Sequence, residues 1–110
     1  MKKSYRTRSR KNGCIYTTFS THAEKRLYDR NVNMLELLSS LCQVSEELCQ
    51  VSSVGKNIAV IAPTLQLAII LHISRCQNGL YYFNVITILG AEIMKRGEVI
   101  FYGVEKLVTV

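Results

Sequence analysis

The chain has 110 residues, of which 48% are hydrophobic and 20% charged, values that fit one small globular domain and exclude wholesale disorder. Fourteen Lys and Arg against eight Asp and Glu give a formal charge of +6. The whole excess lies in residues 1–13, because residues 14–110 carry eight basic and eight acidic side chains. A domain that is basic over its entire surface is therefore excluded.

Residues 1–13 combine this charge with serines and end on Asn12-Gly13, a turn dipeptide. We predict a flexible basic arm over 1–13, followed by a single domain over 14–110. Such an arm would bind phosphate by releasing counterions from a nucleic acid. The candidate RNA-binding residues of the arm are Lys2, Lys3, Arg6, Arg8, Arg10 and Lys11.

The next segments favour one strand and then two helices. Residues 14–20 are aromatic and β-branched, which is typical of a strand. Ser20 or Thr21 can cap a helix over 22–30, and Asn33 can cap a second helix over about 33–43. Residues 44–54 leave helix and strand open, and the β-branched and turn residues at 51–55 favour a strand slightly.

The rest of the chain has β character. Strands are predicted over 57–62, 65–73 and 80–89, with Pro63 ending the first and Asn78-Gly79 marking a hairpin turn. A helical turn over 91–97 and short β segments over 98–102 and 106–110 complete the pattern. This order predicts an α+β domain, with two short N-terminal helices packed on an antiparallel sheet.

The sequence also predicts the compartment. Residues 57–74 form an 18-residue run without formal charge, but Pro63 and several polar residues favour two buried strands over a membrane span. The N-terminus lacks the apolar region of a signal peptide.

The four cysteines form no CxxC pair and no zinc-like cluster. We therefore expect reduced thiols, most of them filling the core, in a cytoplasmic protein without metal or cofactor.

His22, Arg26 and Arg30 are spaced by four residues, which places them on one stripe of the predicted helix. A nitrogen-rich stripe of this kind is a candidate phosphate-binding edge, with His22 near the positive helix N-terminus as a candidate general base. In the alternative interpretation, His22 helps to cap the helix and both arginines are solvated.

The segment Phe19-Ser20-Thr21-His22-Ala23-Glu24-Lys25-Arg26-Leu27-Tyr28-Asp29-Arg30-Asn31-Val32-Asn33 resembles a known signature. The signature is Phe/Tyr-Ser/Thr-x-His-Ala-x-x-Arg-Met/Leu-x-x-Arg-x-Ile/Val. It opens a family of small bacterial and phage domains of uncharacterised function, which are similar to RelE- and RegB-type endoribonucleases. The match covers about 15 residues tightly, and beyond them only the order of elements agrees.

The resemblance implies a RelE-like fold and toxin-like, metal-independent RNA cleavage through attack by the ribose 2′-OH. It also implies that Arg, Lys, His or Tyr side chains of the sheet take part. His72 and Arg75 are the further catalytic candidates, and Tyr82 is a candidate for stacking on bases. RelE-like toxins tend to be basic throughout, whereas residues 14–110 are neutral.

The sequence is therefore compatible with two functions. The first is an RNA-acting domain whose partner is RNA or the ribosome. The second is a non-catalytic phage or plasmid accessory protein that binds a protein partner or self-associates through its sheet. Because two short helices cannot cover both faces of such a sheet, we also predict a homo-oligomer.

Overall fold

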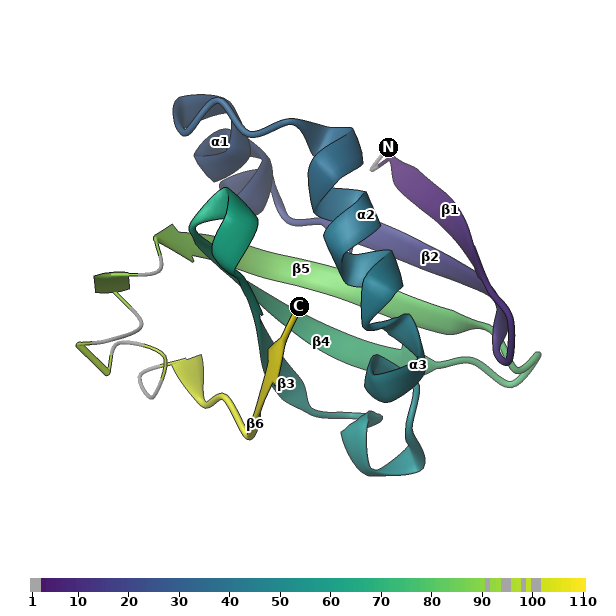
Figure 1. Cartoon of the computed structure of the whole chain (residues 1–110). Helices are drawn as coiled ribbons and strands as arrows, with labels where there is room; N and C mark the ends of the chain where they lie inside the picture. The colour runs from purple at the N-terminus through teal and green to yellow at the C-terminus, as the bar shows by residue number, and fades with distance from the viewer. Residues whose placement is uncertain (1–2, 91, 94–95, 98, 100–101) are drawn as a thin grey trace.

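The computed structural model describes residues 3–90, 92–93, 96–97, 99 and 102–110. The strands within these residues are β1 (Ser4–Ser9), β2 (Gly13–Phe19), β3 (Asn57–Ala62), β4 (Leu67–Arg75), β5 (Tyr81–Gly90) and β6 (Lys106–Thr109). The helices are α1 (Thr21–Asp29), α2 (Met34–Gln43) and α3 (Ser45–Leu48), with 3-10 turns η1 (Val51–Ser53) and η2 (Pro63–Leu65). Together they form an α+β domain, in which α2 and α3 cross one face of the sheet (Figure 1).

The sheet is mixed, with six described strands in the order β1-β2-β5-β4-β3-β6. The hairpins β1–β2, β3–β4 and β4–β5 are antiparallel, but β2 pairs with β5 and β3 pairs with β6 in parallel. The prediction of a purely antiparallel sheet was therefore wrong. Local turn signals predict hairpins between consecutive strands, whereas these parallel pairs join segments separated by helices or by several other strands.

The prediction of a flexible arm over 1–13 fails for residues 4–9, which form β1. This strand pairs with β2 over its whole length. Tyr5 points to the core, where its ring meets Phe19 edge-to-face with centroids 5.7 Å apart. Arg6 and Arg8 point to the other side and are exposed. The alternation of Tyr5 and Thr7 with these arginines is typical of a half-buried edge strand, in which the charges protect the edge.

The two predicted helices are confirmed as α1 and α2. The Ser20 hydroxyl accepts a hydrogen bond from the Ala23 amide at 3.0 Å, and the Asn33 side chain accepts bonds from the first turn of α2. The strand favoured for residues 44–54 was wrong, because α3 and η1 are helical. Ser45 and Leu48 are buried in this segment, so its packing on the sheet overrides its β-branched composition.

Pro63 and the Asn78-Gly79 turn end their strands as predicted. The segment predicted as 106–110 is the strand β6. Of the helical turn predicted over 91–97, residues 92–93 are helical. Of the β segment predicted over 98–102, Val99 and Tyr102 lie in 3-10 conformation instead. Residues 91, 94–95, 98 and 100–101 lie outside the described residues.

The main core lies between the sheet and the helices. It combines residues such as Phe19, Leu37 and Phe83 with the alternate side chains of β3 and β4. A smaller cluster lies on the opposite face, where Val99 packs against Ala59, Ala68, Ile70 and Leu89. Val99, together with Ile93 and Val104, therefore covers part of the second face. The homo-oligomer prediction assumed a bare apolar second face, and it stays untested.

Ser20 joins α1 to the sheet as well as capping it. Its hydroxyl donates to the carbonyl of Ile86 at 2.6 Å, next to the β-bulge where the β4–β5 register shifts. We expect Ser20→Ala to lower the free energy of unfolding by about 1–2 kcal/mol, because both hydrogen bonds are lost. Urea unfolding measures this change. The exposed neighbour Thr21 is the control, and equal effects of Ser20→Ala and Thr21→Ala would contradict the double role of Ser20.

Candidate nucleic-acid interface

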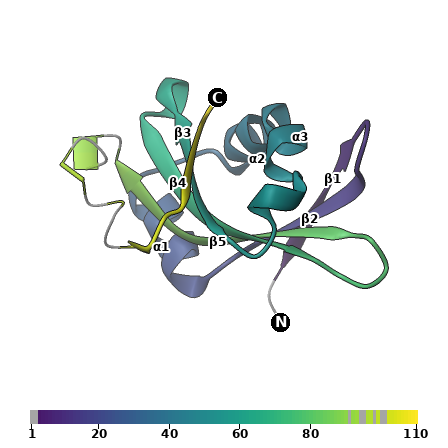
Figure 2. The same cartoon turned by 90° about the horizontal axis from the view of Figure 1, so that it is seen from below.

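The part of the second face that lies outside the small cluster carries polar and aromatic side chains. Cross-strand partners share a face of a sheet, and successive residues of a strand alternate between faces. The strand registers bring these eight side chains, among others, onto one surface, which we call the open face: Arg6, Arg8, Tyr16, Thr18, His72, Ser74, Tyr82 and Asn84. Each of the eight is exposed or half-buried. Figure 2 shows α2 and α3 on the other side of the sheet.

Two tyrosines lie at the centre of the open face. Tyr16 of β2 and Tyr82 of β5 are neighbours in the parallel pairing, and their rings stack with centroids 5.4 Å apart and planes 21° apart. Tyr82 was a candidate from the sequence, whereas Tyr16 was missed. The alternation of Ile15, Thr17 and Phe19 into the core would have placed Tyr16 on the opposite face, but only the parallel pairing makes it the neighbour of Tyr82.

The open face is positively charged. Arg6 lies beside Tyr16 across the hairpin, and Arg8 lies two residues further along β1, opposite Cys14. None of the six described strands contains an aspartate or glutamate. The positive charge of this surface is therefore not neutralised from within the sheet.

A polar row crosses the open face next to the tyrosines. The Thr18 hydroxyl donates to Oδ1 of Asn84. Asn84 is the cross-strand partner of His72, and Nδ1 of His72 lies 2.9 Å from Oδ1 of Asn57. These contacts hold one amide and one imidazole in fixed orientations at the surface.

The predicted stripe on α1 forms, but it lies away from the centre of the sheet. His22 and Arg30 are exposed and Arg26 is half-buried. The guanidinium of Arg30 lies over the end of β5, where a Cβ on Gly90 would be 3.1 Å from Nη1. Figure 2 shows α1 beside β5. The stripe therefore flanks the sheet.

His72 and Arg75 do not come together. They are three residues apart on β4, so they point to opposite faces. The Arg75 guanidinium lies 5.2 Å from the centroid of the Tyr81 ring, on the core side of the sheet. The five predicted catalytic residues thus occupy a helix edge, the open face and the opposite face, and they form no single constellation.

The basic residues of the predicted arm are also divided. Arg6 and Arg8 belong to the open face, whereas Lys11 lies at the hairpin turn and lines a groove with Glu46 and Glu47. Lys3 and Arg10 are exposed, and Lys2 lies outside the described residues. The basic residues that are neighbours in the sequence therefore lie on different surfaces of the domain.

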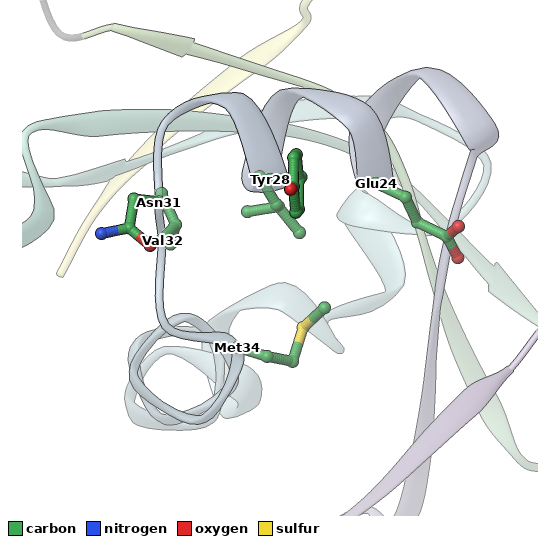
Figure 3. Close-up of a pocket in the computed structure, with 6 residues that line it drawn as sticks. Glu24, Tyr28, Asn31, Val32 and Met34 are labelled. Atoms are coloured by element: carbon green, nitrogen blue, oxygen red, sulfur yellow. The ribbon is translucent and has the colours of Figure 1, made fainter.

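A second groove lies between α1 and α2 and has a volume of about 510 Å³. Figure 3 shows Tyr28 and Met34 facing this space, with Glu24 at one end and Asn31 at the other. None of the residues predicted to act on RNA lines it. The groove is therefore not the candidate site.

The thiols differ from the prediction that most of them fill the core. All four cysteines are free, but Cys42 and Cys76 are exposed, Cys14 is half-buried and only Cys49 is buried. Burial raises the pKa of the Cys49 thiol to about 12, against a smaller lowering effect of Arg75. The native state thus holds this proton more tightly than the unfolded chain does. The resulting stability is present below pH 9 and is lost as the pH rises toward 12.

We expect iodoacetamide at pH 8 to label Cys42 and Cys76 in the native protein and to leave Cys49 unmodified. Cys49 is 4% exposed, and its raised pKa leaves almost no thiolate at this pH. Mass spectrometry of the labelled peptides measures the rates, and the protein unfolded in urea is the control. Labelling of native Cys49 as fast as Cys42 would contradict its burial.

The described residues contain no group of three or more His, Cys, Asp or Glu side chains that could hold a metal ion. None of the described helices is long and apolar enough to cross a bilayer. In comparisons with known proteins, the chain matches no family model, no curated protein and no solved structure. The open face and the signature-like segment 19–33 are therefore the two features of this chain that bear on its function.

Proposed function

We propose that this protein is a RelE-like domain that binds single-stranded RNA on its open face. The observation that carries the proposal is the stacked pair of Tyr16 and Tyr82, flanked by Arg6 and Arg8 on a sheet surface without carboxylates. Aromatic side chains on an exposed sheet stack on unpaired bases, and arginines beside them contact the phosphates.

Single strands suit this surface better than duplexes. A tyrosine can stack on a base only if the base is unpaired at that point, and paired bases in a duplex present only their edges. The resemblance of residues 19–33 to relatives of RelE-type ribonucleases supports RNA as the ligand. Cleavage stays a prediction of that resemblance alone, because the predicted catalytic residues lie on three separate surfaces.

The alternative of a protein-binding accessory protein makes a different prediction for the same surface. A protein interface of this kind is depleted in charge at its core, whereas the open face carries two arginines next to its aromatic centre. This difference favours a polyanionic ligand.

The test is the affinity of the full chain for a fluorescein-labelled U12 RNA, measured by anisotropy. We expect Tyr82→Leu to weaken binding about tenfold, because stacking on one base is lost, and Tyr82→Phe to bind like the wild type. A 12-base-pair RNA duplex should bind less tightly than single-stranded U12.

The matched control is Tyr28→Leu, because Tyr28 is a tyrosine on α1 that is 86% exposed and lies outside the open face. It should leave the affinity unchanged. The proposal is overturned if U12 does not bind, if Tyr82→Leu binds U12 like the wild type, or if the duplex binds as tightly as the single strand.

A further inference from the structure

We propose that Asn84 and His72 select the base that follows the one stacked on Tyr82, so that the open face distinguishes RNA sequences. This inference rests on the proposed RNA binding. It comes from the polar row of Thr18, Asn84, His72 and Asn57, whose hydrogen bonds leave one donor group and one acceptor atom to face a ligand.

The orientation of His72 follows from its neighbours. The amide nitrogen of Asn57 donates to the carbonyl of Tyr102 at 3.4 Å, so that Oδ1 of Asn57 faces the imidazole. Because Oδ1 can only accept, Nδ1 of His72 carries the proton of this contact. In the neutral ring Nε2 is then a hydrogen-bond acceptor.

The orientation of Asn84 follows in the same way. Its Oδ1 accepts from the hydroxyl of Thr18, so the NH₂ group of the amide points away from Thr18 with two donors. Asn84 is the cross-strand partner of His72, and such partners lie roughly 5 Å apart between Cα atoms. A donor and an acceptor thus stand side by side, and the edge of every base offers such a pair in its own geometry.

The position of the row fits this role. Asn84 is two residues beyond Tyr82 on β5, and two residues of a strand span roughly 7 Å. Both side chains are half-buried, which restricts their rotamers and lets them distinguish bases by geometry. Thr18 and Asn57 are positioning residues, because they act by orienting Asn84 and His72.

The test compares A12, C12 and U12 RNA, each labelled with fluorescein. We expect the wild type to bind the best of the three about tenfold more tightly than the worst, which is the usual effect of one pair of hydrogen bonds to a base edge. Asn84→Ala and His72→Phe should reduce this ratio below about threefold. Both variants should lower the affinity only for the RNA that the wild type prefers.

The positioning role has its own readout. Thr18→Val removes the hydroxyl and should reduce the ratio, whereas Thr18→Ser keeps the hydroxyl and should restore it. Ser39→Ala removes an exposed hydroxyl from α2, on the other side of the sheet, and it should leave the ratio unchanged. Unchanged affinity of each variant for the worst RNA shows that it is folded.

Equal affinity of the wild type for the three RNAs would overturn this inference, as would a ratio that survives Asn84→Ala and His72→Phe. Either result leaves the proposed function intact if Tyr82→Leu still weakens binding. Loss of the Tyr82 effect would instead overturn the proposed function itself.

Discussion

Removal of residues 1–9 is expected to lower the free energy of unfolding by at least about 3 kcal/mol, a large share of the stability of a domain of this size. The deletion removes all pairing between β1 and β2, together with the half-buried ring of Tyr5. It also opens one side of Phe19, which is 1% exposed in the native state. Urea unfolding followed by circular dichroism measures the loss.

Deletion of residues 1–3 removes two lysines and leaves β1 whole, so it serves as the control and should unfold like the full chain. The free energy of unfolding of Tyr5→Ala should lie between those of the two deletion variants. We expect it to fall by about 2 kcal/mol, because the ring and its edge-to-face contact are lost. If the chain without residues 1–9 kept the stability of the intact protein, β1 would contribute nothing and the segment would behave as an arm.

The second large effect is expected from charge. Arg6→Gln combined with Arg8→Gln should lower the affinity for U12 RNA about 100-fold at 50 mM salt. The slope of log K against log salt should fall by about 1.4, since each phosphate contact on a single strand contributes about 0.7. Anisotropy titrations between roughly 50 and 300 mM salt provide both values. The screening of charges changes strongly across this range.

Lys11→Gln combined with Lys25→Gln is the matched control, because this variant also loses two positive charges, but at positions outside the open face. Lys11 lines a groove with Glu46 and Glu47, and Lys25 is exposed on α1. We expect a much smaller change of slope in this variant. Equal slopes for the two double variants would mean that net charge alone, and not the open face, attracts the RNA.

The sequence determined the features that depend on neighbouring residues. Ser20 and Asn33 cap their helices because a short polar side chain can accept the free amides of the first turn. Pro63 ends β3, and Asn78-Gly79 turns the chain between β4 and β5. The signal for β1 was also present, in the alternation of Tyr5 and Thr7 with two arginines, but the high charge of the segment favoured an arm.

The separation of His72 from Arg75 could also have been predicted from the sequence, because residues three apart on a strand face opposite sides. Both residues are catalytic candidates of the sequence analysis, but their closeness along the chain does not bring their side chains together. The helical state of residues 45–48 could not be predicted in this way. It depends on burial of Ser45 and Leu48 against the rest of the fold, which outweighs a weak local preference.

Only the tertiary structure decided the candidate site. Tyr16 and Tyr82 form a pair because β2 lies parallel to β5, and the same pairing brings Thr18 to Asn84 across 66 positions of the chain. Parallel neighbours need a long crossover between them, so no local turn residue encodes which strands meet. The sequence by itself determines which side chains share a face of each strand. Which of these faces join into one surface is decided by the order of strands in the sheet, because that order is set by the burial of the whole core.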